Sequence, residues 1–368
     1  MNSRVICKKY QLKTLLGKGS FGEVYEVEDT LTHKRYAAKL ESAAALHQML
    51  SAEARVLKNL QGMTGVPTLV WFGSEDQHNV LIMQLLGPTL QALVEQSKGK
   101  FSLRTMLLLG EQIVHRLEAL HNLSYLHRDI KPENFAVGLD NPALLFVLDF
   151  GLSKKYRDSS THQHIPCREN KGLVGTAKFV SINTHMGMEQ SRRDDLESVA
   201  YMLVNFVKGA LPWQNVTAQT SSEKNRRIME VKLNLAPTIL CKDLPMELIS
   251  FLSYTKGLRF EEQPDYFYMR RLFRDVLIRE KLSTELMFDW MTKGIDRMDS
   301  IKRSRERHMG VQPSGQRQDA SDSSSNGSLS TQIGGTLPYF RQTTRNTIRR
   351  LTQERAQPKS VHSSCSLM

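Results

Sequence analysis

The sequence predicts an α+β fold with two lobes, a β-rich antiparallel N-terminal lobe at residues 10–86 and a mainly helical C-terminal lobe at residues 87–295. Apolar residues recur at strand-like intervals up to residue 40, and at threes and fours from residue 103 onward. Residues 1–9 are predicted as an N-terminal extension. Residues 296–368 are predicted as a disordered, basic, Ser/Thr-rich low-complexity tail, because periodicity ends there.

Composition restricts the class of protein. With 368 residues, 40% of them hydrophobic, the chain can bury a sizeable core, and its 50 Lys and Arg against 38 Asp and Glu favour anionic partners. Cys7, Cys167, Cys241 and Cys365 form no Cys-x-x-Cys pair, which argues against a zinc site or a disulfide framework. We expect reduced thiols and a cytoplasmic location that can extend to the nucleus.

The first strands enclose a glycine-rich loop. Gly-Lys-Gly-Ser-Phe-Gly-Glu-Val at residues 17–24 would let backbone N–H groups approach phosphates closely. A dinucleotide-binding fingerprint would be followed by a helix, whereas the strand-like Val-Tyr-Glu-Val at residues 24–27 follows here. The loop is therefore predicted to join two strands.

Lys39 and Glu53 form a predicted ion pair. Lys39 closes the third strand, and Glu53 falls on the apolar stripe of a helix predicted over residues 43–60. A carboxylate on a buried face is costly unless it is paired, and Lys39 is the natural cation. The alternatives are a surface lysine and a glutamate that reaches solvent from the edge of the stripe.

The second lobe carries two more motifs. A buried strand at residues 80–83 is expected to end before Gly-Pro at residues 87–88, and a helix is predicted over residues 103–126. His-Arg-Asp-Ile-Lys-Pro-Glu-Asn then occupies residues 127–134. Asp-Phe-Gly at residues 149–151 follows a strand predicted at residues 144–148. Taken alone, residues 127–134 could be a polar turn.

Together, in this order, the motifs resemble protein kinases. The resemblance implies ATP and Mg²⁺ as cofactors and assigns roles to the polar residues. Asp129 would orient the substrate hydroxyl, Lys131 and Lys39 would neutralise phosphate charge, and Asn134 with Asp149 would hold the metal. The residues implied for ATP binding are Leu16, Gly17, Lys18, Gly19, Ser20, Phe21, Gly22, Glu23, Val24, Lys39, Met83, Gln84 and Leu86.

Further motifs resemble the casein kinase 1 family of serine/threonine protein kinases over residues 8–295. Ser-Ile-Asn at residues 181–183 stands where many kinases have Ala-Pro-Glu. The other matching segments are residues 85–88, 154–158, 161–166, 168–171, 189–198, 211–214 and 270–274. This resemblance implies serine/threonine specificity, which the spacing of Asp129 and Lys131 marks. It also implies that the side chain of Thr176 forms a hydrogen bond near these two residues.

The same resemblance implies protein substrates that carry an acidic or phosphorylated residue upstream of the target. The basic residues implied for binding this anion form two groups: Lys178 with Lys224, and Arg128 with Lys154 and Lys171. A solvated basic face is the simpler alternative for each of them. Lys178 stands where the family usually has Arg. An arginine can bind an anion through two parallel hydrogen bonds, whereas a lysine offers only a single charged group.

Two other functions are weighed against a protein kinase. A pseudokinase-like scaffold or binding module with little turnover would be expected to lack Lys39, Asp129 or Asp149, and none is missing. A small-molecule kinase should lack the long segment at residues 149–183. We expect a monomeric serine/threonine protein kinase.

The tail concentrates the positive charge. Residues 301–368 hold 11 Lys and Arg against 4 Asp and Glu, a net +7 out of +12 for the chain. Aromatic residues are not interleaved with these charges and no binding motif is recognised, so a solvated linker is expected and nucleic acid is not.

The final four residues, Cys-Ser-Leu-Met from Cys365, fit the C-a-a-X prenylation pattern, and the terminal Met favours farnesyl. One lipid chain anchors weakly, and basic residues of the tail would supply a second signal for peripheral membrane association. These are Arg341, Arg345, Arg349, Arg350, Arg355 and Lys359.

Cys365→Ser should therefore move the protein from the membrane fraction to the soluble fraction of its native cells. Intact mass spectrometry of the unchanged chain should show a farnesyl-sized increment. An unmodified mass, with the same fractionation for both proteins, would leave Cys365 an incidental terminal cysteine.

Overall fold

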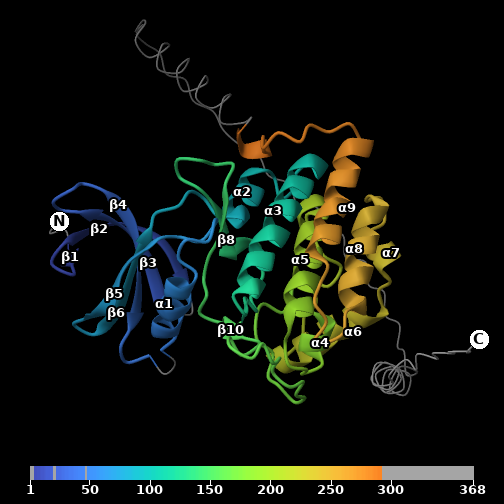
Figure 1. Cartoon of the computed structure of the whole chain (residues 1–368), viewed down its shortest axis with the longest axis horizontal. Helices are drawn as coiled ribbons and strands as arrows, with labels where there is room; N and C mark the ends of the chain where they lie inside the picture. The colour runs from blue at the N-terminus through green and yellow to red at the C-terminus, as the bar shows by residue number, and fades with distance from the viewer. Residues whose placement is uncertain (1–3, 20–21, 46–47, 292–368) are drawn as a thin grey trace, which may run out of the picture. The chain divides into compact units, whose positions relative to one another are not determined.

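The computed structural model describes residues 4–19, 22–45 and 48–291. Ser20 and Phe21 of the glycine-rich loop lie outside the described residues, as do Cys365 and the whole predicted tail at residues 296–368. The described chain has the predicted α+β fold, with a curled antiparallel sheet in the N-terminal lobe and a helical C-terminal lobe (Figure 1). None of the helices described is long and apolar enough to cross a bilayer.

Six antiparallel strands in the order β1-β2-β3-β4-β6-β5 form the N-terminal sheet. Their bounds are Val5–Ile6, Tyr10–Gly19, Gly22–Asp29, Arg35–Ser42, Leu69–Glu75 and His78–Gln84 for β1 to β6. Because β1 pairs with β2, the predicted N-terminal extension contributes a strand to this sheet. One face of the sheet buries Val27, Ala38 and Ile82 in a core of its own.

The helix α1, Leu50–Asn59, covers the other side of the sheet at β5 and β6. The prediction of a helix over residues 43–60 was wrong at its start, because residues 43–45 and 48–49 are not helical. Leu46, which belonged to the predicted stripe, lies outside the described residues. A carboxylate from β4 sets the start: Glu41 Oε1 accepts hydrogen bonds from the backbone N–H groups of Met49 and Leu50. These are amides that a helix leaves without internal partners.

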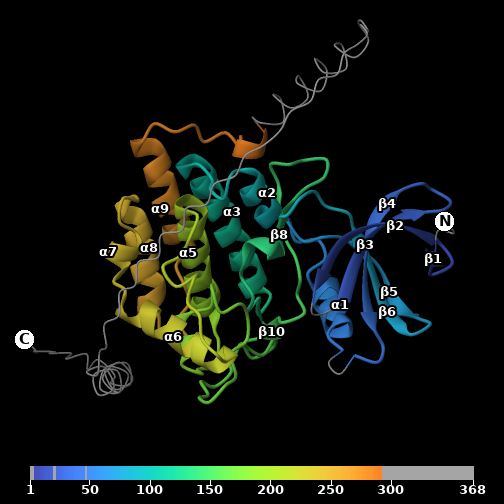
Figure 2. The same ribbon diagram turned by 180° about the vertical axis from the view of Figure 1, so that it is seen from behind.

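Helices surround a buried central helix in the C-terminal lobe (Figures 1 and 2). The helices are α2 Leu90–Gln96, α3 Leu103–Asn122, α4 Ile182–His185, α5 Arg192–Lys208, α6 Ser221–Asn234, α7 Pro237–Leu240, α8 Met246–Gly257 and α9 Tyr266–Arg279. The central helix is α5, which packs against α3 and α8 and is buried along nearly its whole length. Its polar residues therefore face protein and not water.

Two short two-stranded sheets carry the motifs of this lobe. β7, Tyr125–Leu126, pairs with β10, Lys154–Lys155, and β8, Phe135–Val137, pairs with β9, Leu145–Val147. The helix predicted to Leu126 ends at Asn122, because Ser124 adopts the left-handed φ of 69° and turns the chain into β7. The strand predicted over residues 144–148 is one residue shorter at each end.

Candidate functional site

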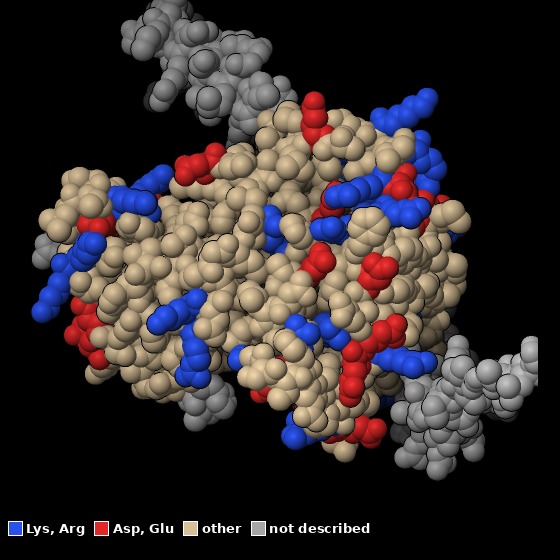
Figure 3. Space-filling view, in the orientation of Figure 1, with Lys and Arg blue, Asp and Glu red and all other residues tan. Residues whose placement is uncertain are grey.

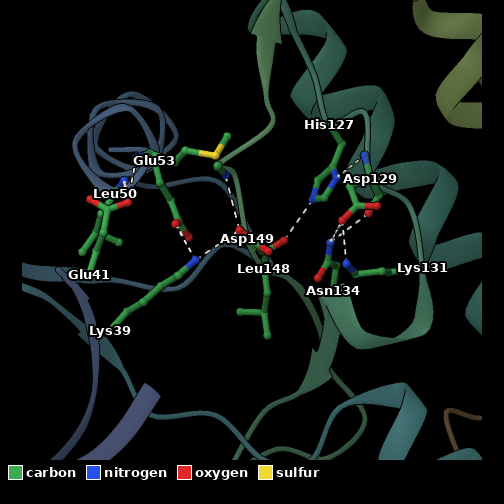
Figure 4. A network of polar contacts seen from close by, with 12 residues as sticks. Lys39, Glu41, Leu50, Glu53, His127, Asp129, Lys131, Asn134, Leu148 and Asp149 are labelled. Atoms are coloured by element: carbon green, nitrogen blue, oxygen red, sulfur yellow. Dashed lines mark hydrogen bonds and ion pairs between the residues drawn. The ribbon is translucent and has the colours of Figure 1, made fainter. Parts of the chain in front are cut away.

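Three elements meet at the ammonium group of Lys39, on β4. Lys39 Nζ lies 2.6 Å from Glu53 Oε2 on α1 and 3.2 Å from Asp149 Oδ1 of the Asp-Phe-Gly motif (Figure 4). Lys39 and Glu53 are 8% and 3% exposed, so both charges are largely removed from water. The structure thus brings together a lysine, a helix glutamate and a loop aspartate that are far apart in sequence.

Burial and charge act in opposite directions on these groups. Burial lowers the pKa of Lys39, but the adjacent carboxylates outweigh it, and the pKa is raised overall. Burial raises the pKa of Asp149, and the charge of Lys39 more than reverses this. For Glu53 burial dominates and its pKa is raised. The lysine stays charged, and Asp149 stays an anion beside it.

Glu41 holds the helix that carries Glu53, and the sequence analysis missed this role. Its Oε1 lies 2.7 Å from the N of Met49 and 3.1 Å from the N of Leu50, while Oε2 accepts a 3.2 Å hydrogen bond from Asn79 Nδ2. Glu41 is 2% exposed. An acidic residue two positions after Lys39, on a strand face that should be apolar, was the available signal.

The carboxylate of Asp129 accepts hydrogen bonds from three side chains. Thr176 Oγ1 donates to Oδ1 at 2.8 Å, and Lys131 Nζ donates to Oδ2 at 2.6 Å. Asn134 Nδ2 lies 3.2 Å from Oδ2 and also donates to the Asp129 carbonyl at 2.8 Å. Asp129 is 4% exposed, so these donors hold a nearly buried carboxylate in one orientation.

Asp195 anchors the backbone of this loop from the buried helix α5. Its Oδ2 accepts from His127 N and its Oδ1 from Arg128 N, each at 2.8 Å. Arg128 adopts a left-handed φ of 68° between these anchored amides and Asp129. His121 Nε2 lies 3.0 Å from Oδ2. The sequence could not show which carboxylate of the Arg-Arg-Asp-Asp run has this role.

His127 connects the segment of Asp129 with that of Asp149. Its Nε2 lies 2.9 Å from the carbonyl oxygen of Leu148, directly before Asp149, and its Nδ1 accepts a 3.3 Å hydrogen bond from the N of Asp129 (Figure 4). The ring is fully buried against Phe150. One imidazole therefore fixes the spacing between Asp129 and Asp149.

Asn134 and Asp149 fit the metal site that the sequence predicts. The amide nitrogen of Asn134 points to Asp129, and Asp149 uses Oδ1 for Lys39 and Gly151. Within the described ranges, Asn134 Oδ1 and Asp149 Oδ2 take part in no hydrogen bond or ion pair. Mg²⁺ prefers such oxygen ligands and commonly takes only one or two from protein, with phosphates and water completing its shell.

The glycine-rich loop divides into packed and open positions. A Cβ added at Gly17 or Gly19 on β2 would meet no atom within 4 Å. A Cβ added at Gly22 would lie 2.0 Å from the carbonyl oxygen of Leu40. Gly22 is therefore required by packing against β4, where its φ is 127°. Lys18 pairs with Glu23 across the hairpin at 3.0 Å, on exposed side chains.

Leu16 and Val24 flank the glycine positions on β2 and β3, and Met83 and Gln84 end β6. The backbone N of Gln84 donates to the carbonyl oxygen of Thr68 at 2.9 Å and so is already used. The N of Leu86 donates to no group among the residues described. Leu86 N thus stays available for the ATP contact that the family resemblance implies.

The structure separates the two predicted anion sites. Lys154 and Lys171 both pair with the buried carboxylate of Glu189, at 3.0 and 3.6 Å. Burial alone would raise the pKa of Glu189, but the two lysines lower it by more than burial raises it. The pKa is therefore lowered overall, and Glu189 is an anion. The side chain of Arg128, the third member, donates through Nε to the Leu152 carbonyl. Much of the positive charge of this group is therefore neutralised within the protein.

Lys178 and Lys224 differ from that group. Neither forms an ion pair with any carboxylate in the described part of the chain. Lys178 follows Thr176 by two residues. Its side chain is partly buried, and this burial lowers its pKa. Over the face seen in Figure 3, Lys and Arg are interspersed with Asp and Glu and form no large basic patch.

Glu41→Ala should lower the free energy of unfolding by about 1–3 kcal/mol, because it leaves two helix amides and Asn79 without a buried acceptor. Urea denaturation measures this. Glu26→Ala, which removes a carboxylate paired with the half-exposed Arg35 at 3.1 Å, serves as the matched control. Its cost should stay below about 1 kcal/mol. Equal losses for both variants would contradict the capping role.

Residues 10–256 match the family model of the protein kinase domain. The match covers more than half of the chain and includes every element that contributes Lys39, Glu53, Asp129 and Asp149. The chain belongs to the protein kinase family and is an ATP-dependent protein kinase.

Proposed function

We propose that this protein kinase transfers the γ-phosphate of ATP to serine and threonine hydroxyls of protein substrates, as casein kinase 1 enzymes do. The observation that carries the proposal is the fixed carboxylate of Asp129, with Thr176 on one oxygen and Lys131 on the other. Asp-x-Lys at these positions is the spacing that the family resemblance connects with serine/threonine specificity.

Each charged group has a task that follows from its position. A substrate hydroxyl that hydrogen-bonds to Asp129 is directed toward the phosphate, and Lys131 lies beside the same carboxylate to balance charge on the transferred group. Lys39, kept charged and immobile by Glu53, neutralises the other phosphates. Positioning and electrostatics therefore account for most of the expected rate enhancement.

Asn134 and Asp149 would hold Mg²⁺, which neutralises charge on the phosphates when bound. The same two side chains contact Asp129 and Lys39, respectively, through atoms other than the oxygens assigned to the metal. A shift of either residue would therefore disturb the hydroxyl acceptor or the phosphate lysine as well. This coupling supports a metal-dependent enzyme over a scaffold with little turnover.

We also propose a preference for acidic or phosphorylated residues upstream of the target, with Lys178 and Lys224 as the anion site. These lysines have no carboxylate partner among the described residues, whereas Lys154 and Lys171 already share Glu189. A substrate phosphate gains more from a cation that is not already paired and is partly removed from water, as Lys178 is.

A positional peptide library tests both parts of this proposal. Wild-type enzyme should phosphorylate serine and threonine peptides and not their tyrosine counterparts, with the highest rates for peptides with an upstream acidic residue or phosphoserine. Lys178→Ala and Lys224→Ala should each raise the KM for the phosphoserine peptide about tenfold, the loss of roughly one charge-assisted contact. The KM for a peptide with neutral upstream residues should stay unchanged.

Lys281→Ala removes an exposed lysine at the end of α9 and serves as the control, which should leave every KM unchanged. Lys154→Ala should have a smaller effect than either substitution at the proposed site. A larger effect for Lys154→Ala would mean that the substrate anion binds at Lys154 and Lys171, the lysines paired with Glu189. Tyrosine phosphorylation, or no preference for anions, would overturn the corresponding part of the proposal.

A further inference from the structure

Lys232 is a buried lysine to which the sequence assigns no role. It lies on α6 and is 1% exposed, yet its long side chain ends in a charged group. Removal of an ammonium from water is costly unless other polar groups replace its hydration. The groups that surround Lys232 Nζ therefore indicate why the fold keeps it there.

Two carbonyl oxygens and an imidazole nitrogen surround the ammonium. Nζ donates to the carbonyl oxygen of Val180 at 2.6 Å and to that of Ala177 at 3.0 Å, and His185 Nε2 lies 3.3 Å away. Burial, followed by the charge of Lys232, lowers the pKa of His185 to about 3. The imidazole is therefore neutral at physiological pH. Its Nε2 also lies 3.2 Å from the carbonyl oxygen of Ala177, so the tautomer decides whether it donates there or accepts from Lys232.

Two aromatic faces complete these surroundings. The ring centres of Tyr201 and Trp213 lie 4.9 and 5.1 Å from Nζ, within the range at which aromatic rings attract a cation. No carboxylate in the described part of the chain forms an ion pair with Lys232. Burial lowers its pKa to about 7, and the negative charge of Glu197 opposes this. The hydrogen bonds of Nζ to protein oxygen atoms therefore go to backbone carbonyls and not to a carboxylate in that part of the chain.

Those carbonyls belong to the segment that follows Thr176, the residue hydrogen-bonded to Asp129. Trp213 Nε1 donates to the carbonyl oxygen of Lys178 at 2.8 Å, between the two carbonyls that Lys232 holds. Three of the four carbonyls at residues 177–180 are therefore fixed by Lys232 and Trp213. Because Thr176 at the start of this segment hydrogen-bonds to Asp129, a hydroxyl that reaches Asp129 comes close to the segment.

The chain just after Val180 is held by Glu197 and by Tyr201, whose ring contacts Lys232. The N of Ile182 donates to Glu197 Oε1 at 2.9 Å, and the hydroxyl of Tyr201, whose ring packs on Lys232, donates to the same oxygen at 2.7 Å. Burial raises the pKa of that hydroxyl, and Glu197 raises it further, so it remains a donor. Lys232 thus joins α6 and α5 to both ends of one short loop.

We propose that Lys232 is a positioning residue for the protein substrate: its ammonium holds the carbonyls of Ala177 and Val180, and so fixes the segment from Thr176 to Lys178 beside Asp129. The inference rests on the transfer to protein substrates proposed above. It assigns to α6 a part in substrate binding that is separate from the nucleotide, because none of these contacts reaches Lys39 or Asp149.

The test compares Lys232→Met with wild type in steady-state assays of a serine peptide and ATP. Methionine keeps the volume and removes the donors, so the KM for the peptide should rise about tenfold or more, the loss of roughly one hydrogen bond from a charged group. The KM for ATP should stay within about twofold of wild type. Lys242→Met, at an exposed lysine after α7, controls for the substitution itself and should change neither constant.

An unchanged peptide KM in folded Lys232→Met, or an equal rise of both constants, would overturn the inference. Lys232→Gln keeps a polar side chain that is too short to reach both carbonyls, and it serves if the methionine variant does not fold: a raised peptide KM with the ATP constant unchanged supports the role, and any other result contradicts it. If wild-type enzyme phosphorylated no peptide, the proposed function would fail first. The two failures are therefore distinguishable.

Discussion

The ammonium of Lys39 lies 2.6 Å from Glu53 and 3.2 Å from Asp149, and three separate parts of the fold depend on these contacts. β4 supplies the lysine, α1 the first carboxylate, and the loop after β9 the second. A buried charge without its partner is strongly destabilising, so α1 and that loop must both be in place before the lysine is stable in the site. The arrangement around Lys39 is thus also a condition on how the lobes fold.

Buried carboxylates on other elements make this arrangement possible. Glu41 sets where α1 begins and therefore which turn presents Glu53, and Asp195 on α5 binds the two amides that precede Asp129. Neither residue would touch ATP or substrate. Each satisfies backbone N–H groups that would otherwise be buried without an acceptor, and each fixes a catalytic side chain by fixing the backbone next to it.

The sequence was informative where one local rule was sufficient. The apolar stripe of one helix, with the cost of burying Glu53, led to Lys39, and the structure places the two groups 2.6 Å apart. It was uninformative where long-range contacts decide the outcome. The start of α1 depends on Glu41, the end of α3 on the left-handed Ser124, and the loop beside Thr176 on Lys232. No periodicity indicates which acceptor a buried side chain will meet.

Asp129→Asn gives the most direct test of the central claim, that this site combines ATP binding with transfer to a hydroxyl directed by one carboxylate. The initial rate of γ-phosphate transfer to a serine peptide and the affinity for ATP should be measured for the variant and for wild type. Wild type should transfer phosphate, and the variant should lose at least about a thousandfold in rate while its ATP affinity changes less than about twofold. A variant that kept its rate, or lost ATP affinity in proportion, would contradict the account.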